Sequence, residues 1–157
     1  GYMTPMDGEQ MESQKQLEKY RTQAEEYLNG WKRAKADLVN YQRQVERERG
    51  EWALYTQADI LQKFLPVMDS LEAAVTLGGQ RAGDGMRQVY EQCLTAFKEC
   101  GVERVDKTGE PPNPEYHEVV AKEKSDAHPQ GLILKVVQNG YTFRGRLLRP
   151  ARVIVSE

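Results

Sequence analysis

The chain has 157 residues, of which 39% are hydrophobic and 29% charged, with a mean hydropathy of −0.75 and a net charge of −2. This length leaves room for one small domain plus an extended element, and the composition is too polar for a single compact globule. The small negative charge gives no electrostatic basis for binding nucleic acid or an anionic membrane, so we expect neither as a partner. The sequence also lacks an apolar run of the roughly 18 residues that a membrane span needs.

The first half of the chain carries the heptad repeat of a coiled coil. Apolar residues recur at alternating spacings of three and four along residues 17–55, and only Glu48 interrupts the series. This period of 3.5 predicts one long helix that pairs in parallel with a second copy of the chain. Several seam positions are aromatic, which predicts looser packing than Leu, Ile or Val would give. The predicted dimer interface in this helix consists of Leu17, Tyr20, Ala24, Tyr27, Trp31, Leu38, Tyr41, Val45 and Trp52.

The middle of the chain predicts two short amphipathic helices. Pro66 suits the first position of a helix, where its missing N–H costs nothing. Glycines at 78, 79, 83 and 85 mark a loop between the two helices, and Gly101 suits the residue that ends the second one. Two such helices form half of a four-helix bundle, which a second chain would complete. We expect Leu71 and Leu94 to lie in that part of the dimer interface.

The residues after Gly101 predict a small all-β domain. Short runs of β-branched residues alternate with turn residues, and Asn139-Gly140 between two apolar runs predicts a β-hairpin. The predicted fold class is therefore α+β, with a long parallel coiled-coil helix, a two-helix segment and a β-domain. We expect these parts at residues 1–10 (a flexible N-terminus), 11–65 (the coiled coil), 66–101 (the two-helix segment) and 102–157 (the β-domain).

No combination of residues typical of a catalytic or metal site is present in the sequence. There is no phosphate-binding loop, dinucleotide motif or nucleophile elbow, and His117-Glu118 lacks the second His of a zinc-protease helix. Cys93 and Cys100 are seven residues apart on one predicted helix, a spacing of about 10 Å that is too long for a disulfide. We therefore expect no enzyme activity, no cofactor and no metal.

Three motifs in the second part of the chain resemble those of the GrpE family. Residues 136–155 run from an aliphatic pair through Gly140-Tyr141 to an Arg-Leu-Leu-Arg tract and alternating valines. The other two motifs are residues 64–71, which follow Asn40-Tyr41 and a basic stretch of helix, and residues 112–118. The three motifs occur in the family's order, and the resemblance covers the chain from about Leu38 to its C-terminus.

The resemblance implies a function without bond chemistry. GrpE proteins are homodimeric co-chaperones that bind the nucleotide-binding domain of a DnaK-type chaperone, open its cleft and let ADP leave. For this chain we expect the same partner, in the bacterial cytoplasm rather than an organellar matrix. The alternative is a dimeric coiled-coil scaffold or adaptor without exchange activity. The expected contacts with the chaperone are Arg43, Arg47, Asn139, Gly140, Tyr141, Arg146, Arg149 and Val153.

Three of these expected contacts have an equally simple structural explanation. Gly140 could serve its turn alone, Val153 could belong to the core, and Arg149 could brace the domain internally.

Overall fold

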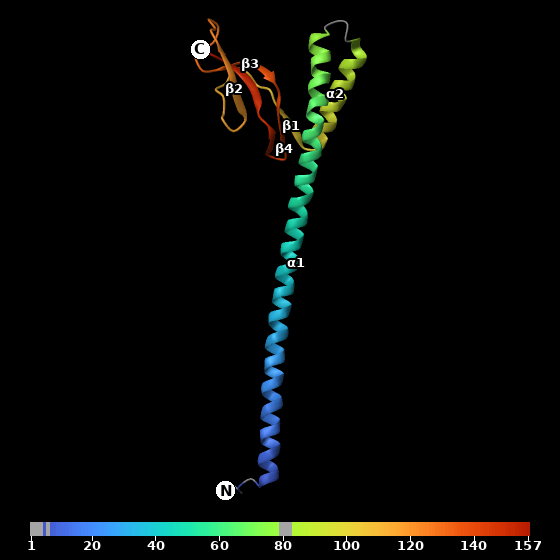
Figure 1. The fold of residues 1–157 in the computed structure, drawn as a ribbon, viewed down its shortest axis with the longest axis vertical. Helices are drawn as coiled ribbons and strands as arrows, with labels where there is room; N and C mark the ends of the chain where they lie inside the picture. Colours follow the sequence, from blue (N-terminus) through green and yellow to red (C-terminus); the bar gives the residue numbers. More distant parts are fainter. Residues whose placement is uncertain (1–4, 6, 79–82) are drawn as a thin grey trace. The chain divides into compact units, whose positions relative to one another are not determined.

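The computed structural model describes residue 5, residues 7–78 and residues 83–157. These residues form α1 (Gly8–Leu77), α2 (Gly83–Glu99), β1 (Val102–Val105), β2 (His117–Glu123), β3 (Ile133–Gln138), β4 (Gly140–Phe143), β5 (Arg146–Arg149) and β6 (Ala151–Ser156) (Figure 1). The long N-terminal helix and the all-β C-terminal region confirm the predicted α+β class. Contacts divide the chain into two compact units, Gly1–Ala53 and Leu54–Glu157, with the boundary inside α1.

The first unit consists mainly of the N-terminal part of α1. The Asp7 side chain accepts a hydrogen bond from the backbone N–H of Gln10 at 2.8 Å, which is the usual way to cap a helix N-terminus. The helix therefore begins at Gly8, inside the part expected to be flexible, while residues 1–4 and 6 lie outside the described residues. Its apolar stripe is uncovered within the described part of the chain, with Tyr27 75% and Trp52 71% exposed.

The helix continues through Pro66, so the prediction that a new helix begins there is wrong. An interior proline lacks the N–H that would bond to the carbonyl of Gln62, which costs about 3 kcal/mol. Leu65 and Met68, on either side of the proline, are each only 2% exposed. Burying two side chains of this size contributes roughly 1.5–3 kcal/mol each, which offsets the lost bond. The predicted two-helix segment is therefore the end of α1 followed by α2.

The second helix begins earlier than the sequence suggests. Residues 83–85, predicted to be part of a loop, form the first turn of α2, where the carboxylate of Asp84 interacts favourably with the helix dipole. The rest of that predicted loop, residues 79–82, lies outside the described residues. The predicted end of the helix is confirmed, because Gly101 has a φ of 93° and its N–H bonds to the carbonyl of Lys98 at 3.0 Å.

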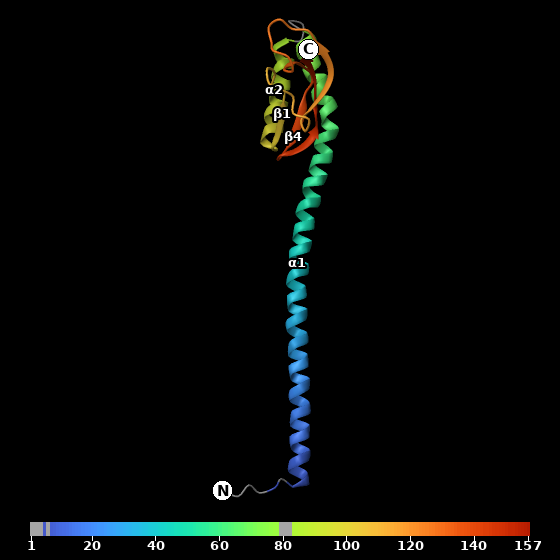
Figure 2. The same cartoon turned by 90° about the vertical axis from the view of Figure 1, so that its left-hand side faces the viewer.

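The β-domain consists of two three-stranded sheets. One has the strand order β1-β4-β5 and is antiparallel throughout; the other has the order β2-β6-β3, with β2 parallel and β3 antiparallel to β6. The first sheet lies beside the helices, with β1 next to α2 (Figure 2). Its residues Val102, Tyr141, Phe143 and Leu148 form a buried cluster with Ala58 and Leu65 of α1. The second sheet has its own core, Ile133, Ala151, Val153 and Val155.

The predicted hairpin at Asn139-Gly140 is wrong, because these residues connect the two sheets. β3 pairs with β6, whereas β4 pairs with β1 and β5. A Cβ atom on Gly140 would lie 2.5 Å from the backbone nitrogen of Ala151, so glycine is required here by close approach of two backbones. The hairpin joins β4 to β5 through Arg144 and Gly145, whose φ angles of 48° and 79° are typical of a tight two-residue turn.

Candidate functional site

Three of the expected contact residues are exposed arginines. Arg43 and Arg47 lie one turn apart on α1 and line a shallow surface groove with Asn40 and Glu51. Arg146 begins β5, directly after the β4–β5 turn. None of the three forms an ion pair within the part of the chain that the structure describes. Their guanidinium groups are therefore oriented to solvent, where they could bind carboxylates of a partner.

Tyr141 lies at the junction between the β-domain and the helices rather than on the surface. Its side chain is 1% exposed, and its ring meets that of Phe97 edge-on with 6.2 Å between centroids. The Arg149 guanidinium lies 5.4 Å from the centre of the Tyr141 ring. Burial, with the nearby groups of Tyr90 and Glu72, raises the pKa of Tyr141 to about 12. Its hydroxyl has no hydrogen-bond partner among the described residues.

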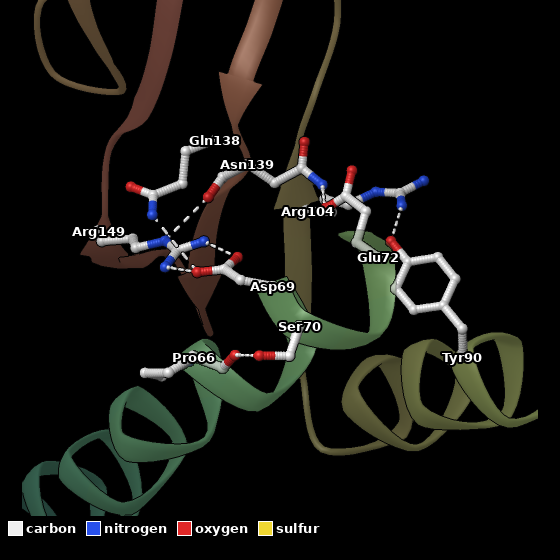
Figure 3. Close-up of polar contacts among 9 residues, drawn as sticks. All are labelled: Pro66, Asp69, Ser70, Glu72, Tyr90, Arg104, Gln138, Asn139 and Arg149. Atoms are coloured by element: carbon white, nitrogen blue, oxygen red, sulfur yellow. Dashed lines mark hydrogen bonds and ion pairs between the residues drawn. The ribbon is translucent and has the colours of Figure 1, made fainter. Parts of the chain in front are cut away.

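Arg149 makes a bidentate ion pair with Asp69 (Figure 3). Its Nη1 and Nη2 donate to the two Asp69 carboxylate oxygens at 2.7 and 2.5 Å, while its Nε–H donates to the carbonyl of Asn139 at 2.9 Å. The Asn139 amide in turn donates to Glu72 at 2.7 Å, and the Gln138 amide reaches Asp69 at 3.4 Å. We call these five residues the Asp69 cluster. It joins α1 to β5 and to the β3–β4 connection.

Sequence reasoning missed three members of this cluster, Asp69, Glu72 and Gln138. Asp69 is the one charged residue in the motif at residues 64–71, and Glu72 directly follows that motif; these charges beside apolar residues are the signal that could have identified the two positions. Their partners could not be read from the sequence, because Asp69 and Arg149 are 80 residues apart.

A second polar contact joins α2 to β1. The Arg104 guanidinium donates to the Tyr90 hydroxyl at 2.9 Å (Figure 3). It also forms an ion pair with Asp106 at 2.8 Å. Burial of the Tyr90 ring is the largest cause of its raised pKa. The first sheet is thus held by polar contacts to both helices.

The two remaining β-domain residues expected at the contact lie in the interior. Val153 is fully buried in the core of the second sheet. Gly140 is also buried, where it allows β4 to pass close to the β5–β6 connection. Both therefore shape the domain from within.

The predicted dimer seam presents large apolar side chains to solvent. Its exposed fractions range from 55% to 75% for Leu17, Tyr20, Tyr27, Trp31, Leu38, Tyr41 and Trp52. Ala24 is exposed as well, and Val45, Leu71 and Leu94 are half-buried.

A pocket of about 500 Å³ lies between β1 and the loop that leads to β2. It has mixed charge, with Asp106, Lys107 and Arg144 among its lining residues. His117 also lines it, but Nδ1 of this ring accepts the backbone N–H of Asn113 at 2.9 Å and so closes a turn.

Residues 5, 7–78 and 83–157 lack two kinds of feature, a metal-binding cluster and a membrane-spanning helix. No three or more His, Cys, Asp or Glu side chains gather there in a group that could hold a metal ion. No helix in that part of the chain has the length and apolar character to cross a membrane. Cys93 and Cys100 are both free thiols.

Comparisons with known proteins give one consistent result. Residues 3–157 match the sequence profile of the family described as GrpE. The chain is 38% identical over 152 residues to Protein GrpE of Nitrosococcus oceani, covering 92% of this chain and 71% of that protein. Identity to Protein GrpE of Alkalilimnicola ehrlichii is 35% over 152 residues, covering 93% and 70%. Protein GrpE of Staphylococcus carnosus is 29% identical over 157 residues, covering 97% and 77%.

Proposed function

Because the chain belongs to the GrpE family, we propose that it is a co-chaperone that accelerates nucleotide exchange on a DnaK-type chaperone. The observation that carries this proposal is the family match over residues 3–157, which includes both the long helix and the β-domain. The role is one of binding rather than catalysis. The similarity to GrpE proteins of bacteria such as Nitrosococcus oceani also supports a place in the bacterial cytoplasm.

The mechanism follows from differential affinity. The chain binds the open form of the nucleotide-binding domain more tightly than the closed form, and this difference sets how far the cleft opens. Opening removes contacts to ADP and so speeds its release. ATP and the exchange factor weaken each other's binding by the same factor, because coupling between two ligands is reciprocal. ATP therefore displaces the exchange factor and completes the cycle.

We propose that the exposed arginines contact the chaperone directly. Arg43, Arg47 and Arg146 have free guanidinium groups, which suit a partner surface rich in carboxylates. The other expected contacts, Asn139, Gly140, Tyr141, Arg149 and Val153, lie inside the second unit and support the β-domain that carries Arg146. Charge pairing of this kind mainly raises the association rate, so binding weakens as salt rises.

The chain acts as a parallel homodimer in this proposal. The exposed aromatic and leucine side chains along α1 form a stripe with the 3.5-residue period of a coiled coil, which a second copy would cover. A scaffold without exchange activity would also need this seam. The β-domain and its exposed Arg146 favour the exchange factor, because a scaffold has no need of them.

Complex formation with the chaperone tests the proposal. A nucleotide-free DnaK-type chaperone is titrated with the chain by isothermal calorimetry, and ATP is then added. We expect a complex that ATP dissolves, and affinity lowered by about tenfold or more in an Arg43→Ala/Arg47→Ala variant, which corresponds to 1.4 kcal/mol. Arg33→Ala, an exposed arginine on the same helix, is the matched control. Absence of a complex with the nucleotide-free chaperone would favour the scaffold.

A further inference from the structure

The contact between the β-domain and α1 has an apolar centre. Tyr141, Phe143 and Leu148 of the first sheet pack against Ala58 and Leu65 of the helix. Apolar burial stabilises this junction in proportion to the area removed from water, but it is non-directional. Small rotations of the sheet on the helix would therefore cost little if the apolar contact were the whole junction.

The Asp69 cluster supplies directed contacts at the edge of this apolar centre (Figure 3). All three nitrogens of Arg149 donate hydrogen bonds inside the protein, two to Asp69 and one to the carbonyl of Asn139. A guanidinium is a planar fork, so a bidentate pair fixes angle as well as distance. Arg149 is therefore bound internally in a defined orientation.

Two attachment points on α1 hold two parts of the β-domain. Asp69 binds Arg149 at the end of β5, in the first sheet. One turn further along the helix, Glu72 binds Asn139, which connects β3 of the second sheet to β4 of the first. Because these two attachment points lie one turn apart along α1, they resist both rotation and sliding of the β-domain on the helix. They also restrain both sheets.

The stability that this ion pair contributes does not by itself explain its presence. The Arg149 and Asp69 side chains are 19% and 29% exposed, so both have lost most of their hydration. At sites of this kind, a well-packed apolar pair is often as stabilising as the ion pair or more so. Directed polar contacts instead select one arrangement among several of similar energy.

We propose that the Asp69 cluster sets the orientation in which α1 presents the β-domain to the chaperone, and that Arg149 is a positioning residue for nucleotide exchange. The inference rests on the proposed function, because orientation affects activity only if the β-domain acts on a partner. A loosened β-domain still binds the chaperone through its exposed residues. The loosened β-domain stabilises the open cleft less well. The maximal rate of ADP release therefore falls more than the affinity for the chaperone does.

The central variant is Asp69→Leu/Arg149→Met, which replaces the ion pair by apolar side chains. Its matched control is Asp59→Ala/Lys63→Ala, which removes an exposed ion pair of 3.2 Å that lies within the same helix. Arg149→Lys is a third variant that keeps the charge and loses the fork. Thermal unfolding, monitored by circular dichroism, identifies any variant that fails to fold.

Two measurements are made on the dimeric full chain. Spin labels at Gln57→Cys and Lys122→Cys, in a Cys93→Ser/Cys100→Ser background and diluted with unlabelled chain, report the distance distribution between α1 and β2 by pulsed electron paramagnetic resonance. ADP release from a DnaK-type chaperone, measured against the concentration of the chain, separates the maximal rate from the half-saturating concentration.

We expect the central variant to melt no lower than wild type and to show a broader distance distribution. Its maximal rate should fall by about tenfold, because misplacing interacting groups by ~1 Å can cost up to 10²-fold. Its half-saturating concentration should stay within about twofold, which is under 0.5 kcal/mol. For Arg149→Lys, both the maximal rate and the width of the distance distribution should lie between those of wild type and the central variant. The control should match wild type in both measurements.

Other outcomes overturn the inference. An unchanged distance distribution would show that the apolar contact alone sets the orientation. A changed half-saturating concentration with an unchanged maximal rate would make Arg149 a direct contact with the chaperone. If wild type itself gives no acceleration, the proposed function fails, and the distance distributions alone still decide whether the cluster fixes the orientation.

Discussion

Tyr141 is the residue whose ionisation is most strongly tied to the fold. Burial raises its pKa to about 12, so the folded chain keeps this proton at a pH where the unfolded chain, with a pKa of 10.0, loses it. Stability from the neutral phenol is complete below pH 10 and is lost as the pH rises towards 12. We expect the free energy of unfolding to fall there by up to about 1.4 kcal/mol per pH unit. Urea unfolding at a series of pH values measures this fall in the free energy of unfolding.

The control for this pH dependence is Tyr141→Phe. The difference between the stability curves of the two proteins measures the contribution of the Tyr141 phenol. At neutral pH the variant should be as stable as wild type or more so, by about 1 kcal/mol, because it removes a buried hydroxyl without a partner among the described residues. Parallel curves up to pH 12 would contradict the assignment.

Gly140 should tolerate no side chain. A Cβ atom there would meet Ala151 N at 2.5 Å and the Pro150 carbonyl carbon at 3.0 Å, and both are backbone atoms that cannot rotate away. We expect Gly140→Ala to lower the free energy of unfolding by about 3 kcal/mol, the upper range for overpacking. Chemical denaturation measures this. Gly85→Ala, in the first turn of α2 with no atom within 4 Å, should be neutral or stabilising.

The sequence identified Gly140 and Tyr141 as unusual but assigned them the wrong surroundings. Their apolar flanks and the Asn-Gly pair favour a hairpin tip, which would be exposed. Both residues are buried instead, because the chain leaves the second sheet at the end of β3 and enters the first sheet as β4. A local pattern cannot show that the chain changes sheets.

At the scale of elements, the long helix contains a proline that weakens it. Replacing Pro66 with Ala would restore a donor for the carbonyl of Gln62, and the exposed proline ring makes few contacts that could be lost. We expect Pro66→Ala to raise the free energy of unfolding by up to about 3 kcal/mol. Thermal unfolding shows whether the variant is more or less stable than wild type. A lower melting temperature of the variant would mean that the helix needs a bend at this position.

Periodic patterns predicted the elements well where the pattern is long. The heptad repeat of residues 17–55 identified the helix, and the change to a period of two after Gly101 identified the β-domain. The continuity of the helix through Pro66 could not be predicted, because it depends on burial of Leu65 against the distant β-domain. Tertiary packing of this kind overrides the low helix propensity of proline.

At the scale of the whole molecule, we expect two copies of the chain to assemble through the predicted seam. Wild-type chain should sediment as a dimer at micromolar concentration. Leu38→Asp places two like charges opposite each other in the predicted seam and should shift the mass towards that of a monomer, because charged residues at seam positions weaken coiled coils. Ala36→Asp, on the exposed face of the helix opposite the seam, should stay dimeric. A monomeric wild type would contradict the proposed assembly.

The candidate site was only partly readable from the sequence. Exposed Arg43, Arg47 and Arg146 lie on surfaces, as the motifs led us to expect. Asp69 and Glu72 escaped notice because their partners are 80 and 67 residues away, and a single sequence does not pair such positions. For the same reason, the sequence left open whether Arg149 contacts the chaperone or braces the domain internally.

Stopped-flow release of a fluorescent ADP analogue from a DnaK-type chaperone tests the central claim most directly. The chain is added at increasing concentration, together with the Arg43→Ala/Arg47→Ala variant and its Arg33→Ala control. We predict a release rate that rises and saturates at about 5–150-fold above the spontaneous rate, the range that coupling energies of 1–3 kcal/mol produce. An unchanged rate at concentrations where the complex forms would contradict the account and leave a dimeric coiled-coil scaffold.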